Sequence, residues 1–520
     1  MAKKLVSLLV VLALALSLVP AMAETAPATD YTQWFPGVDT SEHVVLTYLV
    51  TGNIPTNKTN DALAIINEKL TAAINAEIQV EWIEWADWQT KYNLALAMQD
   101  GTVDLIGTAT DWLDAWPNTQ KGAFLPLSED MLKTYAPKTF ASVTPEHWNL
   151  CKYDGQIYLM PEDNYSQWTN HGFLYRGDYA KEAGLDGVHS WEDLGKYFQY
   201  VKDTYPDVIP WDADGSGSSY SDQLMGGWIA SKTGGINIEG FPAPLFFGKS
   251  TTDPYTLSTF FTEGDSLVEF AKQMKAWSDA GYWREDVLNY TGDIKAEMKE
   301  GLTSANQHHT QTWKTERYNI EKLIPGSDVG FFWFGEESNT LVSLNITHGA
   351  MAIAAQSDNP ERALMAYDLM RNDPTIYKLL NYGMEGQQYI IDENGYMARP
   401  DTYKDESVDG VTFDYWWGRN DNLELRSAVV DWAAYDALVA KYDAVKIDYP
   451  YGQVVFNMDE VSAEMDNLSN VFRTYAPVIC FGKNDDPEAY VAEFRQALKD
   501  AGIEKVMASV QAQIDAVYKK

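Results

Sequence analysis

Short strand-like segments alternate with amphipathic helical segments through the first hundred residues of the chain. Residues 43–50 form an apolar run, and residues 60–74 follow with apolar side chains three or four positions apart. A second strand-like segment (77–82), a helical segment (88–99) and a third strand-like segment (103–106) come next. Strands that alternate with helices in short units predict an α/β layer built on a mostly parallel sheet.

The same alternation resumes after about residue 161, so the whole chain belongs to one fold class. We expect strands over 171–176, 329–333 and 350–355, and helices over 194–204, 265–280, 359–371 and, as a pair, 486–518. Ser190-Trp-Glu-Asp193 has the pattern of a capping box at a helix start. A chain of 520 residues exceeds the roughly 250–300 residues of a single core, which predicts more than one domain.

The amino-terminal segment predicts secretion. Lys3 and Lys4 precede an apolar run over residues 5–19, and Ala21-Met-Ala23 follows. This order is typical of a signal peptide over residues 1–23, cleaved after Ala23. The apolar run is shorter than the ~20 residues of a membrane-spanning helix, which disfavours an anchor. Glu24 stands where lipoproteins carry their lipid-attachment Cys, so we expect no lipid anchor, and residues 24–41 form a flexible lead-in.

The net charge narrows the range of binding partners, and the two cysteines bear on whether a disulfide forms. There are 75 acidic against 39 basic residues, a formal net charge of −36. Such a field repels phosphate backbones, so we expect no nucleic-acid partner and no anionic lipid partner. The distant Cys151 and Cys480 leave a disulfide open, although two separate buried thiols are favoured.

Motifs of metal sites and enzymes are weak or missing. Residues 212–217 begin like a calcium loop with Asp212 and Asp214, but position 12 of that loop would be Gln223 where a glutamate is required. A polar turn is favoured, and we predict no metal and no cofactor. The sequence contains no His-Glu-x-x-His, Gly-x-Ser-x-Gly or Ser-x-x-Lys motif. We therefore expect no enzyme, with a secreted glycoside hydrolase as the weaker alternative.

Several segments resemble a known family in the order in which they occur. They are Asp104–Trp112 with Gly122–Leu127, Tyr153–Pro161, Phe173–Leu185 with Ser190–Leu194, Asn381–Tyr389, and the carboxy-terminal stretches Asp486–Glu488, Ala501–Val506 and Val510–Ala516. Together they resemble the family 1 extracellular solute-binding proteins of ABC importers, the maltose-binding-protein-like group. The carboxy-terminal stretches are similar to a region found in sugar-importer lipoproteins of Gram-positive bacteria.

The resemblance implies a type II periplasmic-binding-protein-like fold with two α/β lobes that close by a hinge. Lobe 1 would comprise residues 42–163 and 346–390, lobe 2 residues 164–345, and a carboxy-terminal region, 391–520, would pack its helices on the lobes. The implied function is capture of a carbohydrate, in particular an oligosaccharide, by a monomer that delivers it unchanged to an ABC permease in the membrane. A peptide or another small solute remains an alternative ligand.

Candidate ligand contacts are aromatic and polar residues placed after strands or between lobes. Aromatic faces stack on sugar rings, and carboxylates and amides bond to hydroxyls. Asp111 and Trp112 follow the strand at 103–106, and the resemblance places ligand contacts in this loop. Asn53 follows the first strand in the same way, although it also suits a turn.

Further candidates come from the lobe crossing and from later aromatic residues. Asn164, Tyr165 and Trp168 lie where the chain would cross between the lobes. The resemblance points to Trp228 and Trp313 as stacking residues in lobe 2, with core packing as the alternative. Trp416 and Trp417 are consecutive, so they face opposite ways in an extended chain, and at least one should reach the cleft.

Overall fold

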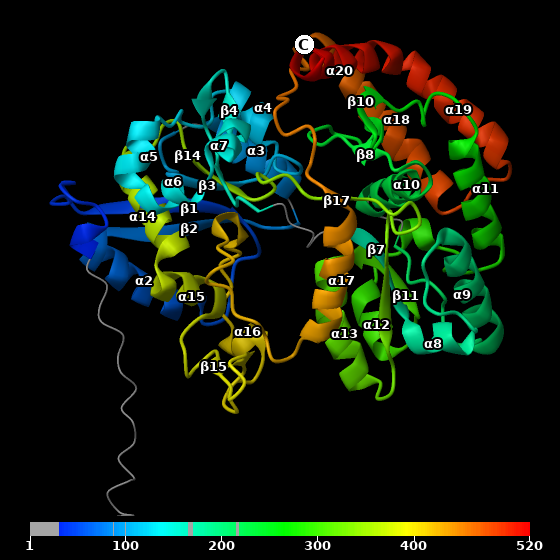
Figure 1. The fold of residues 1–520 in the computed structure, drawn as a ribbon, viewed down its shortest axis with the longest axis horizontal. Coiled ribbons are helices and arrows are strands. Elements are labelled where there is room, and N and C mark those ends of the chain that lie inside the picture. Colours follow the sequence, from blue (N-terminus) through cyan, green and yellow to red (C-terminus); the bar gives the residue numbers. More distant parts are fainter. Residues whose placement is uncertain (1–30, 87, 99, 165–169, 215–217, 520) are drawn as a thin grey trace, which may run out of the picture.

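The fold has two halves, each with its own sheet and its own core (Figure 1). The computed structural model describes residues 31–86, 88–98, 100–164, 170–214 and 218–519. The predicted signal peptide and part of the lead-in lie outside these residues. Among the described residues, no helix has both the length and the apolar character needed to cross a bilayer.

Lobe 1 is built on a five-stranded sheet in the order β2-β1-β3-β14-β6. The strands are β1 (Val44–Thr51), β2 (Ala76–Ile83), β3 (Leu105–Thr108), β6 (Met160–Pro161) and β14 (Ala350–Ile353). The first three strands are parallel, and β14 runs antiparallel to both β3 and β6. A strand from residue 350 thus completes a sheet begun at residue 44.

Helices cover both faces of this sheet. They are α2 (Thr59–Ile74), α3 (Trp88–Met98), α4 (Ala115–Gln120), α5 (Glu129–Tyr135), α6 (Pro137–Ser142), α7 (Pro145–Leu150), α14 (Pro360–Asn372) and α15 (Pro374–Tyr382), with a small hairpin of β4 (Lys152–Tyr153) and β5 (Gln156–Ile157). The predicted periodicity of α2 is confirmed, because Ile66, Leu70 and Ile74 are fully buried along one face. Each such side chain stabilises the core by about 1.5–3 kcal/mol.

Lobe 2 contains a three-stranded sheet, β11-β7-β12, and a second one, β10-β9-β8. Their strands are β7 (His171–Arg176), β8 (Ile236–Asn237), β9 (Phe247–Ser250), β10 (Asp253–Leu257), β11 (Ala305–His309) and β12 (Val329–Trp333). The helices are α8 (Gly177–Glu182), α9 (Trp191–Thr204), α10 (Ser218–Thr233), α11 (Ser266–Asp279), α12 (Ile294–Glu300) and α13 (Thr310–Leu323). As the capping box predicts, the Ser190 side chain accepts a hydrogen bond from the Asp193 backbone N–H.

The expectation of a mostly parallel sheet is wrong for lobe 2. Strand β7 is antiparallel to β11 and to β12. The register pairs His309 with His171 and Trp333 with Gly172, so both partners end where β7 begins. The physical reason is that the chain enters lobe 2 along β7, and both later strands run back towards the crossing.

The carboxy-terminal region contacts both lobes. It contains β15 (Ile390–Ile391), β16 (Met397–Ala398), α16 (Glu406–Asp409), α17 (Trp432–Val445), β17 (Lys446–Ile447), α18 (Ser462–Cys480), α19 (Pro487–Asp500) and α20 (Ile503–Tyr518). Trp417 belongs to the core of lobe 1, whereas β17 pairs with β13 (Leu341–Val342) next to lobe 2. Figure 1 shows α18 and α19 lying against α10 and α11 of lobe 2, and α20 lying against β10.

The two cysteines do not bond to each other. Cys151 is buried in the core of lobe 1 and Cys480 in the core of lobe 2. Burial raises the pKa of the Cys151 thiol well above its usual range, which keeps it protonated. The favoured prediction of two separate buried thiols is confirmed.

Candidate ligand-binding site

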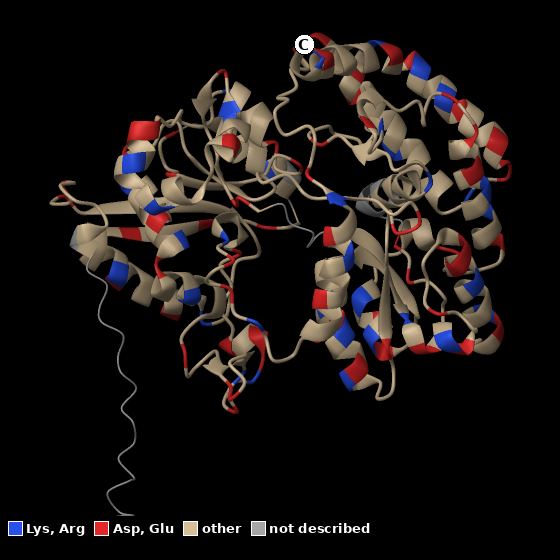
Figure 2. Cartoon of the chain, in the orientation of Figure 1, with Lys and Arg blue, Asp and Glu red and all other residues tan. Residues whose placement is uncertain are grey.

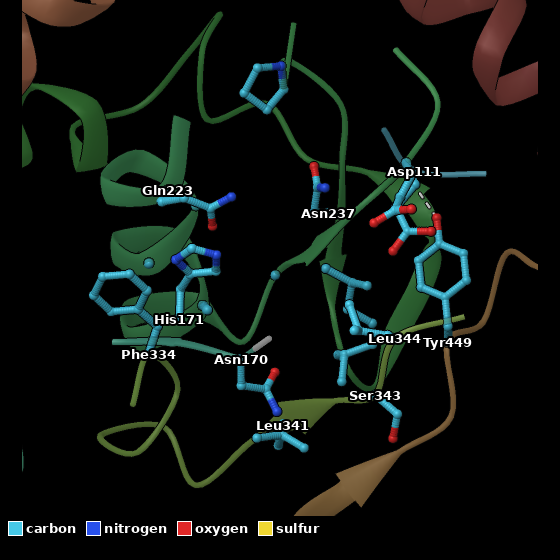
Figure 3. A pocket seen from close by; sticks show the side chains of 18 of the residues that line it. Asp111, Asn170, His171, Gln223, Asn237, Phe334, Leu341, Ser343, Leu344 and Tyr449 are labelled. Carbon is cyan, nitrogen blue, oxygen red and sulfur yellow. Dashed lines mark hydrogen bonds between the residues drawn. The ribbon is translucent and has the colours of Figure 1, made fainter. Parts of the chain in front are cut away.

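A cavity of about 480 Å³ lies between the lobes. Lobe 2 provides most of its wall, Asp111, Trp112 and His348 reach it from lobe 1, and Tyr449 comes from the carboxy-terminal region. In Figure 3, His171 and Phe334 lie together beneath Gln223, while Asp111 and Tyr449 lie on the opposite side. A volume of this size suits a small molecule of several rings.

Trp112 is the aromatic surface that lobe 1 offers to the cavity. The chain leaves β3 at Thr108, and Trp112 stacks on the buried Trp417 at 5.6 Å between ring centroids and 25° between planes. Trp88 contacts it edge-on at 5.3 Å, and Trp85 stacks at 5.9 Å. Packing between these rings fixes the Trp112 indole, so little rotamer entropy is lost when a ligand binds.

The antiparallel register of lobe 2 builds the opposite wall. His171 begins β7 and His309 ends β11 at the same sheet edge, and Phe334 follows β12 there. Helix α10 adds Gln223 and Gly227, which lie one helical turn apart. Strands β11 and β12 both end where β7 begins, so His309 and Phe334 lie at the same end of the sheet as His171. Helix α10 adds the amide group of Gln223 to this wall.

A carboxyl–imidazole–carboxyl cluster joins the two lobes. The Nδ1 of His348, just before β14, lies 2.6 Å from Oδ2 of Asp111. Burial lowers the pKa of His348, but the Asp111 carboxylate outweighs it, and the net result is a pKa of about 9. Burial, and then the Asp111 charge, raises the pKa of the Glu239 carboxyl well above its usual range. Glu239 follows β8, and its backbone N–H donates to the Tyr449 hydroxyl at 2.8 Å.

The cavity wall is nearly neutral in a strongly acidic protein. Acidic and basic residues are spread along the helices of both lobes (Figure 2). Inside, His348 and Asp111 compensate each other, and the Glu239 carboxyl resists ionisation. Burial lowers the pKa of His171 to about 3 and of His309 to about 4, so both imidazoles are neutral at neutral pH.

Several polar atoms that line the cavity are buried without a hydrogen-bond partner among the described residues. They are Oδ1 of Asp111, Nδ2 of Asn170, Oε2 of Glu239 and Oγ of Ser343. Buried polar groups without partners are costly, so such atoms mark places where a ligand completes the bonding. The set mixes acceptors, a hydroxyl and an amide donor, which matches a ligand rich in hydroxyl groups.

Two predicted contacts, Asp111 and Trp112, line the cavity. The structure places Trp228 and Trp313 in cores and not on the lining of this cavity. Trp228 packs edge-on against Trp191 at 5.3 Å, on the face of α10 turned away from the cavity. Trp313 is buried in a separate core, where its Nε1 donates to the Val329 carbonyl at 2.9 Å.

The remaining predicted contacts lie outside the cavity or outside the described residues. Trp417 is buried behind Trp112, and Trp416 emerges 43% exposed, 6.2 Å from the Trp85 ring. Asn53 is exposed at the end of β1, and the Asn164 amide donates to Asp421 at 2.7 Å. Tyr165 and Trp168 fall outside the described residues.

Asp212 has a structural role in lobe 2. Its Oδ2 accepts a hydrogen bond from Thr303, and its Oδ1 lies 3.1 Å from the Arg284 guanidinium. Burial, and then the nearby Glu297 carboxylate, raises the pKa of Asp212 to about 8. The rest of the calcium-like loop, residues 215–217, lies outside the described residues.

Sequence reasoning missed most of the lobe 2 wall. His171, Glu239, His309, Phe334 and His348 all line the cavity. His309 ends the polar run over residues 306–309, which lies within β11, and this run is a signal that could have been used. Glu239 and His348 lie in connecting segments that carry no sequence signal of their own.

Comparisons with known proteins agree with this geometry. A family model described as bacterial extracellular solute-binding protein matches residues 65–382, more than half of the chain. A domain of unknown function, DUF3502, matches residues 450–519. A relative from Streptococcus pneumoniae serotype 4, named carbohydrate ABC transporter substrate-binding protein, is 23% identical over 92% of both chains.

Solved structures share the fold. The N-glycan transport solute-binding protein NgtS from Streptococcus pneumoniae is similar with a TM-score of 0.71, at 19% identity over 92% of this chain and 100% of that one. It has also been solved with Man1GlcNAc and with Man5GlcNAc. FusA from S. pneumoniae, in complex with kestose, has a TM-score of 0.62 at 16% identity over 91% of this chain and 99% of its own. These likenesses show the type II two-lobe fold.

Proposed function

The chain belongs to the bacterial extracellular solute-binding protein family, and on that basis we propose that it captures a neutral oligosaccharide between its lobes and delivers it unchanged to an ABC permease. As a member of this family it works outside the cytoplasm. The carbohydrate named for its relative and the sugars bound by structurally similar proteins support the ligand class.

The observation that carries the proposal is the composition of the interlobe cavity. A rigid indole, Trp112, stands on one wall, and imidazole and amide groups stand on the other. Sugars combine an apolar C–H face with a rim of hydroxyls, and they need this combination of surfaces. Oδ1 of Asp111 and Oε2 of Glu239, which are buried with no partner among the described residues, can form hydrogen bonds with those hydroxyls.

The electrostatics favour a ligand without net charge. Asp111 is balanced by His348, and the raised pKa of Glu239 opposes a second negative charge. An acidic sugar would place its carboxylate beside Asp111 and Glu239. The charges of Asp111 and His348 are already paired with each other, so neither is left to balance a peptide terminus. A neutral oligosaccharide carries neither cost.

Isothermal titration against a panel tests the proposal. The panel contains Man1GlcNAc, Man5GlcNAc, kestose, an alginate oligosaccharide and a mixed tetrapeptide. We expect at least one neutral sugar to bind with micromolar or tighter affinity, with no change in its mass after a day with the protein. Binding of the peptide alone, binding of none, or chemical conversion of a sugar would overturn the proposal.

A further inference from the structure

A second cavity, of about 330 Å³, adjoins the first. Glu239 and Tyr449 line both cavities, so these two residues stand where they meet. The second cavity lies within the roughly 300–1,000 Å³ range of small-molecule sites. Its place next to the interlobe cavity raises the question of what it holds.

Its walls belong to different parts of the chain. Helix α4 of lobe 1 provides Trp116 and Gln120, and Tyr451 and Phe456 face them from the segment that leads into α18. Gln120 Nε2 donates to the Phe456 carbonyl at 3.2 Å across this boundary. The segment after residue 450 is the start of the region matched by the domain of unknown function.

The second cavity shares aromatic, amide and hydroxyl groups with the first, and its lining also contains Lys121 and Asp459. Aromatic residues stand beside amide and hydroxyl groups such as Gln120 and Ser462. Two polar atoms on its lining, Oε2 of Glu239 and Oδ1 of Asn345, are buried with no partner among the described residues. A sugar hydroxyl both donates and accepts hydrogen bonds, so it can bond to either atom.

We propose that the second cavity is an extension subsite for the further sugar units of a longer neutral oligosaccharide, and that residues 450–462 form its outer wall. The inference rests on the proposed function of the interlobe cavity. It gives the domain of unknown function a role as part of the ligand-contacting surface. Because α4 and residues 450–462 both line the second cavity, a ligand that extends into it contacts lobe 1 and the carboxy-terminal region at once.

A substitution that fills the subsite from its exposed rim tests this proposal. Ser462 is exposed at the start of α18 and lines the cavity, so Ser462→Trp occupies space there without disturbing a core. Asn470→Trp is the matched control, since Asn470 is exposed on the same helix and does not line the cavity. Thermal melts and circular dichroism of both variants verify that they fold as the parent does.

The ligands are a short and a long member of the series that the parent protein binds, Man1GlcNAc with Man5GlcNAc or kestose with fructo-nystose. We expect Ser462→Trp to weaken the long ligand about tenfold or more and the short one less than twofold, whereas Asn470→Trp changes neither. Equal weakening of both ligands, or of neither, overturns the subsite. If the parent binds no sugar at all, the proposed function itself fails, and that outcome is visible before any variant is made.

Discussion

Three side chains from three parts of the chain set the charge of the cavity. Asp111 follows β3 of lobe 1, Glu239 follows β8 of lobe 2, and His348 lies just before β14 of lobe 1. Their protons are linked, because the Asp111 charge raises the pKa of both of the others. The ionisation of this cluster therefore depends on how the two lobes are positioned relative to each other.

The protonated His348 makes stability depend on pH. Its pKa is about 9 in the folded protein and 6.5 in an unfolded chain, so the folded state holds the proton more tightly. This stabilisation is fully present below about pH 6.5 and is lost as the pH rises through about 9. The free energy of unfolding should fall by up to about 3 kcal/mol across that window.

Urea denaturation at intervals from pH 6 to 9.5 measures this slope. His348→Gln should remove most of it, whereas His43→Gln, at an exposed position on lobe 1, should leave it unchanged. A slope in the His348→Gln protein equal to that of the parent would rule out the Asp111–His348 pair as its origin.

Two tryptophans predicted to share one role should respond in opposite ways. Trp112→Ala removes a cavity wall, and we expect sugar affinity to fall about tenfold or more, which corresponds to about 1.4 kcal/mol. Trp228→Ala leaves a hole in the core of lobe 2 and should cost about 3–5 kcal/mol of stability. Titration and thermal melts of both variants measure the two effects; a Trp228 variant that loses affinity at full stability would contradict the assignment.

These two residues also show why the sequence could identify only part of the site. Trp112 was predictable because it follows a strand end, where parallel α/β sheets expose their loops. Trp228 lies on a helix, and whether a helical aromatic residue faces a core or a cavity depends on packing that no local pattern encodes. Glu239 and His348 line the cavity only because segments that are distant in the sequence come together in the fold.

Among the elements, helix α10 has one face in the core of lobe 2 and the other face on the interlobe cavity. Leu224, Met225 and Trp228 are buried on one face, and Gln223, Gly226 and Gly227 line the cavity on the other. The absence of a side chain at Gly227 lets Phe334 approach the helix. The backbone of α10 is thus part of the cavity wall.

Adjacent glycines give a matched pair of variants. A Cβ at Gly227 would lie 2.5 Å from the Phe334 ring, whereas one at Gly226 would lie 3.8 Å from Phe247. We expect Gly227→Ala to displace Phe334 and weaken sugar binding severalfold. Gly226→Ala should leave binding intact and raise stability by up to about 1 kcal/mol through helix propensity. Equal affinities of the two variants would show that Phe334 does not shape the site.

Most of these elements were predictable, while their pairing was not. The periodicity of α2 and the Ser190 cap gave correct helices because both signals are local. The direction of β7 relative to its neighbours was mispredicted, since it depends on where a chain returns after more than a hundred residues. The return of the chain along β11 places His309 beside His171, so this pairing of distant segments also determines which residues line the cavity.

For the whole molecule, a ligand that touches both lobes should draw them together. Trp112 belongs to lobe 1, and His171 and Gln223 belong to lobe 2, so one ligand bridges walls that are otherwise joined by crossing segments. Small-angle scattering should show a smaller radius of gyration when the sugar is saturating. Trp112→Ala at the same sugar concentration should show less compaction, and an unchanged radius in the saturated parent would exclude closure.

The position of β14 has a consequence for how the protein matures. The central sheet of lobe 1 is completed only by β14, which begins 189 residues after the end of β6. Pairings so distant in sequence form slowly, because the intervening chain must be closed into a loop first. We therefore expect the first third of the chain to complete its fold late, and a chain that folds late suits export through a narrow membrane channel.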